Sequence, residues 1–260
     1  MTLGADTLTE LLVVALASGL AGLVDAIVGG GGLVLIPALF STFPSAAPAT
    51  LFGTNKSASV WGTAMAAWQY GRRVKIDLAL VGPGIAAALA GSFSGAWAVT
   101  VVDGSLLRKA LPFVLLAVLA YTLARKNLGR DHQPLADRRR ALRLLLVIAL
   151  GVGFYDGFFG PGTGSFLIFL LVRLLGYDFL HASATAKCLN VATNGAALLL
   201  FALKGHVWWQ LGGVMALTNI AGGLLGARLA LRHGAGFVRG VFLVVVSALI
   251  AKTAYDAFLR

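Results

Sequence analysis

The chain has 260 residues, of which 58% are hydrophobic and only 12% are charged. Soluble domains are about half apolar and about a quarter charged, so this composition excludes a water-soluble fold. The formal net charge of +11 does not indicate a nucleic-acid partner, because the 21 Lys and Arg residues are spread through short loops.

Apolar runs between glycine-rich and charged loops predict an all-α integral membrane protein with about eight transmembrane helices. Each run is near the roughly 20 residues that cross the hydrocarbon core. Two shorter apolar segments, 33–43 and 166–175, are expected to be half-helices or re-entrant segments. The expected spans are 8–28, 54–70, 78–102, 105–125, 142–159, 183–203, 209–232 and 236–257.

The sequence matches itself when it is displaced by 131 positions. Lys56 falls on Lys187 (187 − 56 = 131), and Asp25 falls on Asp156. This duplication predicts two homologous four-span repeats, each with one glycine-rich broken or re-entrant helix. Glycines that recur at the same offset are expected to mark close helix crossings, because small residues let helices approach in a membrane; they are Gly82, Gly91 and Gly95 with Gly213, Gly222 and Gly226.

The predicted organisation is a first repeat over 1–125, a basic linker over 126–141 and a second repeat over 142–260. Basic residues also gather in the loop 72–75, and the positive-inside rule places both basic segments in the cytoplasm. With eight spans, both termini are expected to be cytoplasmic and the repeats parallel. An odd number of crossings per repeat would make the repeats inverted.

Each repeat carries a glycine-rich motif that follows an aspartate. Glycine costs about 1 kcal/mol relative to alanine in a helix interior, so these glycines predict a break in the helix. The N–H groups that open the following half-helix suit an anion. The alternative is that the glycines only permit close helix packing. The candidate substrate-binding residues here are Gly29, Gly30, Gly31 and Gly32 in the first repeat and Gly160, Gly162, Thr163, Gly164 and Ser165 in the second.

Asp25 and Asp156 lie beside these breaks within apolar surroundings. A carboxylate at the centre of a membrane helix costs about 2.5–3.5 kcal/mol on the insertion scale, which indicates a specific role. One interpretation is proton coupling, in which the carboxyl group takes up and releases a proton between access states. The other is structural: each carboxylate caps a half-helix or pairs with a Lys or Arg.

A second motif places lysines and amides at the start of two apolar helices. Ammonium and amide groups supply the charge and hydrogen-bond donors that a sulfonate or carboxylate needs in a partly dehydrated pocket. The lysines could instead extend to the membrane interface or pair with the aspartates. The candidate substrate-binding residues are Asn55, Lys56, Ser57, Lys187, Asn190 and Asn194.

The histidines are isolated in the sequence, in loops or at helix ends, and Cys188 is the single cysteine. This pattern contains no recognisable metal-ligand cluster, so neither a metal nor a cofactor is expected. A membrane-embedded enzyme is an unfavoured alternative, because the intramembrane polar residues include no nucleophile paired with a base. The histidines are His132, His181, His206 and His233.

Four stretches together resemble the sulfite exporter family of the TauE/SafE type, which comprises bacterial and archaeal permeases. They are GLVDAIVGGGGLVLIPAL, GTNKSAS, GFYDGFFGPGTGSFL and ATAKCLNVATN, and the resemblance runs from about Leu11 to Leu259. The resemblance implies a multi-pass protein of the cytoplasmic membrane. It also implies export of small sulfur-containing or organic anions, such as sulfite or sulfoacetate, driven by the proton gradient.

The resemblance assigns roles only at matching positions, namely both glycine motifs, both aspartates, both lysines and the three asparagines. Ala186 stands where the first repeat has Asn55, so the repeats are not expected to contribute equally. The substrate is expected between the repeats, near the middle of the membrane. A passive anion channel is the alternative function, and the oligomeric state stays open.

Overall fold

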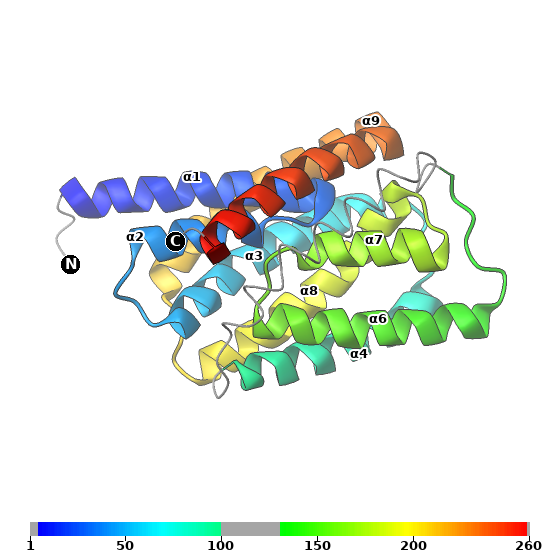
Figure 1. Cartoon of the computed structure of the whole chain (residues 1–260), viewed down its shortest axis with the longest axis horizontal. Helices are drawn as coiled ribbons and strands as arrows, with labels where there is room; N and C mark the ends of the chain where they lie inside the picture. Colours follow the sequence, from blue (N-terminus) through cyan, green and yellow to red (C-terminus); the bar gives the residue numbers. More distant parts are fainter. Residues whose placement is uncertain (1–4, 100–130, 259–260) are drawn as a thin grey trace.

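The computed structural model describes residues 5–99 and 131–258, and in this part the chain consists of helices joined by turns (Figure 1). The predicted span 105–125 and residues 126–130 of the predicted linker lie outside the described residues. The helices are α1 (Ala5–Val28), α2 (Gly32–Thr42), α3 (Pro48–Gly71), α4 (Leu78–Ala98), α6 (Arg138–Phe158), α7 (Thr163–Leu175), α8 (Phe179–Leu203) and α9 (Trp209–Phe258).

Five of these helices contain segments long and apolar enough to cross a membrane, which confirms the all-α integral membrane class. The segments are Leu8–Val28, Leu78–Ala98, Arg138–Phe158, Phe179–Leu203 and Trp209–Val245. α3 is not among them, although its 24 residues would extend about 36 Å. It carries a buried polar segment, Thr54 to Ser57, while Trp61 and Trp68 are exposed on its outer face.

α9 contains the break that the sequence predicts between its last two spans. Gly234 has φ 74°, which lies in the left-handed region that glycine adopts without strain. The chain reverses there, and the red C-terminal part of α9 runs back along the bundle in Figure 1.

Both predicted helix breaks are present. α1 ends at Val28 before α2, and α6 ends at Phe158 before α7. α2 and α7 have 11 and 13 residues, or about 16 and 20 Å, which is too short for a hydrocarbon core of about 30 Å. Gly29 and Gly160, with φ of 76° and 89°, make the turns possible.

The short helices return along the helices that precede them. Leu35 and Leu39 of α2 pack in one cluster with Ala21 and Val14 of α1, so α2 runs back toward the start of α1. α1 and α2 therefore form a hairpin. Figure 1 shows the same course for α6 and α7. The expectation of half-helices is confirmed.

The prediction of parallel repeats is wrong. α3 and α8 correspond under the 131-residue offset, yet they run antiparallel, because Thr50 contacts His206 just beyond α8 while Lys56 contacts Asn194. α2 and α7 each run back along the helix before them, and α3 and α8 begin at opposite ends of the bundle. These corresponding helices of the two halves are therefore inverted relative to each other.

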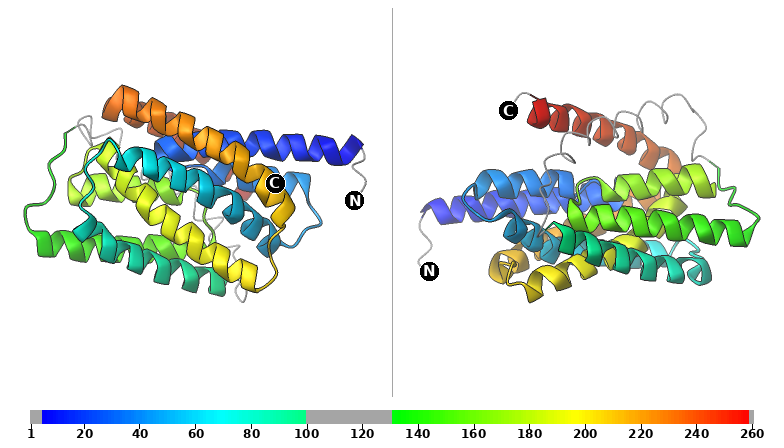
Figure 2. Two further views of the ribbon diagram at one scale, coloured as in Figure 1. Left: turned by 180° about the vertical axis from the view of Figure 1, so that it is seen from behind. Right: turned by 60° about the horizontal axis from the view of Figure 1, so that its bottom comes forward.

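The first residues of α1 and the last residues of α9 lie at the opposite end of the bundle from residues 131–137 in both views of Figure 2. The loop before α4 belongs to the linker end, because Asp77 pairs with Arg138 at 3.0 Å. The predictions of a cytoplasmic linker and of cytoplasmic termini therefore cannot both be correct.

Glycines permit close helix contacts between α1 and α9 and between α4 and α6. A Cβ atom at Gly222 would lie 1.9 Å from the carbonyl oxygen of Gly19, and one at Gly95 would lie 2.0 Å from that of Phe154. Gly91 and Gly226 are similarly tight. Gly82 and Gly213 have nothing within 4 Å of such an atom, so the prediction of a close crossing is wrong at these two positions.

We expect Gly222→Ala to lower the free energy of unfolding by about 1–3 kcal/mol, because the added methyl group would force α1 and α9 apart. Gly213→Ala, on the same helix, is the matched control and should be neutral or slightly stabilising. Unfolding of both purified variants in mixed micelles measures the difference. Equal stabilities would show that the close approach of α1 and α9 is not required.

Candidate functional site

Two ion pairs connect the halves of the molecule in a crossed arrangement. Nζ of Lys56 lies 2.6 Å from Oδ2 of Asp156, and Nζ of Lys187 lies 2.8 Å from Oδ2 of Asp25. Each lysine therefore pairs with the aspartate of the other half. The structure therefore shows the lysines paired with the aspartates, one of the interpretations drawn from the sequence. The pairing brings all four predicted charged residues to the helix breaks.

Each ion pair has a third polar partner at an equivalent position. Lys56 donates a second hydrogen bond of 2.9 Å to Oδ1 of Asn194, while Thr63 donates one of 3.2 Å to Oδ2 of Asp25. Thr63 and Asn194 are also related by the offset of 131. Thr63 was not a sequence candidate, although the internal repeat could have identified it through Asn194.

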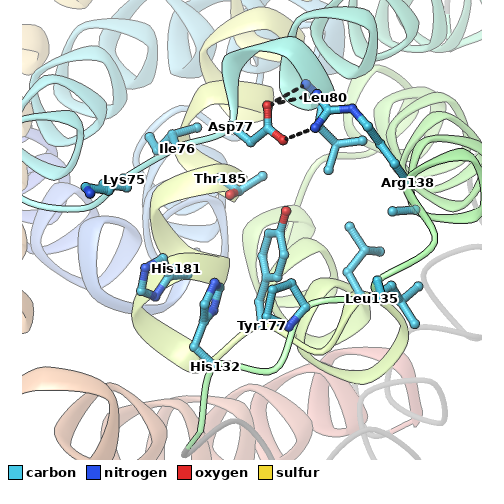
Figure 3. A pocket seen from close by; sticks show the side chains of 14 residues that line it. Lys75, Ile76, Asp77, Leu80, His132, Leu135, Arg138, Tyr177, His181 and Thr185 are labelled. Carbon is cyan, nitrogen blue, oxygen red and sulfur yellow. Dashed lines mark hydrogen bonds and ion pairs between the residues drawn. The ribbon is translucent and has the colours of Figure 1, made fainter.

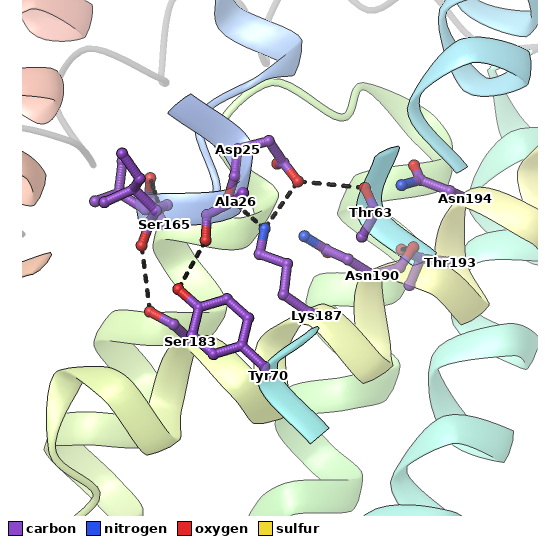
Figure 4. Close-up of polar contacts among 12 residues, drawn as sticks. Asp25, Ala26, Thr63, Tyr70, Ser165, Ser183, Lys187, Asn190, Thr193 and Asn194 are labelled. Carbon is purple, nitrogen blue, oxygen red and sulfur yellow. Dashed lines mark hydrogen bonds and ion pairs between the residues drawn. The ribbon is translucent and has the colours of Figure 1, made fainter. Parts of the chain in front are cut away.

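The last four carbonyl groups of α1 accept hydrogen bonds from side chains of other helices (Figure 4). The last carbonyls of a helix lack partners within it, and no water satisfies them in the hydrocarbon core. The carbonyl of Asp25 also accepts from the N–H of Gly29 at 2.8 Å. The protein supplies the donors and so stabilises a helix end at membrane depth. The pairs are Lys187 to Asp25, Tyr70 to Ala26, Ser183 to Ile27 and Ser165 to Val28.

The two glycine-rich breaks contact each other directly. The N–H of Ser165 donates to the carbonyl oxygen of Gly29 at 3.2 Å. A Cβ atom at Gly29 would lie 2.2 Å from the backbone of Gly164, so neither position has room for a side chain. The glycines thus serve both interpretations, because they break the helices and permit close contact at the same point.

A small polar cavity of about 30 Å³ lies where the breaks meet. It has room for on the order of two water molecules. The first residues of α2 and α7 open onto it, so it faces two helix N-termini. Its lining residues are Asp25, Gly29, Gly32, Asn55, Lys56, Ser59, Asp156, Gly160, Thr163, Gly164, Asn190 and Asn194.

The lining includes most of the predicted site residues and adds Ser59, a polar α3 residue at the same offset from Asn190 that the sequence analysis did not select. Lys187 is fully buried and does not line the cavity. Ser165 caps Val28, and the hydroxyl of Ser57 donates to the carbonyl of Thr54. The predicted residues outside the lining are Gly30, Gly31, Ser57, Gly162, Ser165 and Lys187.

Two amide oxygens at the cavity have no hydrogen-bond partner among the described residues. They are Oδ1 of Asn55 and Oδ1 of Asn190, and both side chains are buried. A buried polar atom without a partner costs about 1–3 kcal/mol. Such atoms beside a polar cavity indicate a place where a polar guest would add hydrogen bonds, since an amide can present either its oxygen or its NH₂ group.

Buried ion pairs at broken helices within an apolar bundle are features of membrane transport proteins. The chain matches the profile of the sulfite exporter TauE/SafE family over residues 14–253, and it belongs to this family. It is a membrane transporter by this membership.

Named relatives cover most of the chain. It is 39% identical to the probable membrane transporter protein YfcA of Escherichia coli K12, over 92% of this chain and 87% of the relative. It is 36% identical to a probable membrane transporter protein of Haemophilus influenzae, over 98% of both chains. A third relative, the probable membrane transporter protein ORF9 of Sinorhizobium, is 36% identical over 92% of this chain. No solved structure matches the chain significantly.

Proposed function

We propose that this protein transports a small sulfur-containing or organic anion, such as sulfite or sulfoacetate, across the bacterial cytoplasmic membrane. The anion binds at the cavity between the two halves, and its movement is coupled to protons. The observation that carries this proposal is the cavity itself, which combines the Lys56 ammonium with two helix N-termini. Both favour a negatively charged guest.

The Lys56–Asp156 ion pair suggests how protons are coupled to the anion. An anion can contact the ammonium only in competition with the carboxylate that lies 2.6 Å from it. Protonation of Asp156 would remove that competing charge and leave Lys56 available. A proton and a singly charged anion would then enter together without adding net charge to a buried site, where unpaired charge is costly.

The size of the cavity favours a carrier over a passive channel. About 30 Å³ is too small for sulfoacetate, so the cavity would have to widen before that anion could bind. Binding and release would require the halves to move. The inverted arrangement of α3 and α8 suits alternating access, in which one repeat rocks against the other around a central site. We infer that the chain arose by duplication of one such repeat.

The basic segments suggest the orientation. Under the positive-inside rule, Lys75 and Arg138 at the linker end lie in the cytoplasm. Arg228 and Arg232 come just before the reversal within α9, and the orange segment of α9 where the chain turns lies toward the linker end of the bundle in Figure 1, so the basic residues agree. The start of α1 and the finish of α9 then face the outside of the cell.

Flux of radiolabelled sulfite and sulfoacetate into proteoliposomes tests the proposal. With an acidic outside, we expect saturable uptake that a protonophore reduces to the level seen without a pH gradient. Protein-free liposomes measure leakage, and Lys56→Met is the site control. Non-saturating currents under voltage clamp would favour a channel. Absence of flux for both anions in a folded protein would contradict the substrate class.

A further inference from the structure

A cluster of metal-ligating side chains lies at the linker end, away from the cavity. It brings together His132 in the linker, Asp178 before α8 and His181 in the first turn of α8. One possible ligand atom from each of the three residues lies within 4.8 Å of the other two. Sequence spacing contained no signal for this cluster, because His132 and His181 are far apart in the chain and only packing makes them neighbours.

The imidazole rings of His132 and His181 stack, with centroids 3.8 Å apart and planes inclined by 24°. His132 also lies against Tyr177, with ring centroids 5.3 Å apart. Figure 3 shows both imidazoles side by side at the wall of an adjoining pocket of about 250 Å³. A metal ion held there would have an open side facing this pocket.

The backbone holds the linker in this position. The N–H of Gln133 donates to the carbonyl of Gly176 at 2.9 Å, and the N–H of Leu135 donates to that of Leu175 at 3.1 Å. Gly176 has φ 78°, and a Cβ atom there would lie 2.1 Å from the Gln133 carbonyl oxygen. The turn between α7 and α8 is therefore shaped to receive the linker, which places His132 beside α8.

The ligand atoms are close enough to share a late first-row divalent cation. Nδ1 of His181 and Oδ2 of Asp178 now hydrogen-bond at 2.9 Å, and they would need to separate only to the roughly 3.3 Å between two ligand atoms on a tetrahedral zinc ion with bonds of about 2.0 Å. His132 is exposed and can rotate to bring its nitrogen nearer. Two imidazoles and one carboxylate favour zinc, nickel or copper over magnesium or calcium.

We propose that His132, Asp178 and His181 form a binding site for zinc or a similar divalent cation, with the fourth position open to the pocket. The metal would take the place of the proton between Asp178 and His181. It would join the linker between the two halves to the start of α8, the helix that carries Lys187. This proposal does not depend on the identity of the transported anion.

Isothermal titration of the full chain in detergent tests the proposal, with the protein purified on a tag that contains no histidine and treated with a chelator. We expect saturable binding of one zinc ion per chain and no binding of magnesium. Cobalt in place of zinc should give the visible absorption of a four-coordinate site. The proposal would be overturned if the protein bound no zinc, or if it bound more than one equivalent without saturation.

Variants identify the ligands. His132→Ala and His181→Ala should each weaken zinc binding by at least about tenfold, since loss of even an outer partner weakens metal sites by 10–100-fold. Asp178→Asn keeps an oxygen that can cap α8 but removes the anionic ligand, and it should have a similar effect. His233→Ala is the matched control and should bind as wild type. Unchanged affinity in the His132 and His181 variants would overturn the assignment.

Discussion

Lys56→Met is expected to abolish anion flux and to lower the free energy of unfolding by about 3–5 kcal/mol. The stability loss arises because the substitution leaves Asp156 charged, buried and without its partner. The loss of flux arises because Lys56 is the lysine that lines the cavity. Unfolding in mixed micelles and flux into proteoliposomes measure the two effects separately.

The double variant Lys56→Met/Asp156→Asn separates folding from function. It removes both charges at similar side-chain volume, and such replacements are often neutral for stability. We therefore expect stability close to wild type with no anion flux. Normal flux in this folded variant would show that the Lys56–Asp156 pair is structural and that the anion binds elsewhere.

Lys187→Met is expected to be the more destabilising of the two lysine substitutions. It removes the partner of Asp25 and also a positive charge from the C-terminal end of α1, where a cation can contribute up to about 2 kcal/mol in a partly buried setting. Lys187 is fully buried, so no water can replace its ammonium group. The same unfolding measurement compares it directly with Lys56→Met.

The matched double variant Lys187→Met/Asp25→Asn should recover only part of that stability, because the interaction with the end of α1 is still missing. Once folded, it should retain some anion flux, since Lys187 does not line the cavity and the Asp25 carboxylate, which does, is replaced by a neutral amide that does not repel the anion. Complete loss of flux in a folded protein would contradict this division of roles and assign substrate binding to both lysines.

The two ion pairs are equivalent in sequence but not in surroundings. Lys187 meets the Asp25 carbonyl at a helix end that four side chains cap, as Figure 4 shows, whereas Lys56 faces the cavity. Asn55 and Ala186 already indicate in the sequence that the halves differ. Which half would contribute more to the site was not predictable from them, because a cavity forms from side chains of several helices.

Local features of the chain were readable from the sequence. The apolar runs predict the helices, since a bilayer requires each crossing to be long, apolar and internally hydrogen-bonded. The breaks at Gly29 and Gly160 were predictable because glycine is disfavoured within helices and adopts positive φ. Asp25, Asp156, Lys56 and Lys187 were identified because charge at membrane depth needs a partner or a role.

The number of crossings was not readable in the same way. A hairpin such as α1 with α2 has the hydropathy of a crossing followed by a short apolar segment. Whether the second helix continues or returns depends on its contacts with α1, and therefore on packing. The parity of crossings then decides whether the halves are parallel or inverted, which is why the predicted orientation of the repeats was wrong.

The sequence by itself determined the membrane class, the family, the helix breaks and the charged residues, because each is a property of a short segment or of a repeated pattern. Only the tertiary structure decided that the aspartates and lysines pair crosswise, that Lys56 rather than Lys187 faces the cavity, and that His132 lies beside His181. These are contacts between residues distant in the chain, and the direction and packing of whole helices determine them.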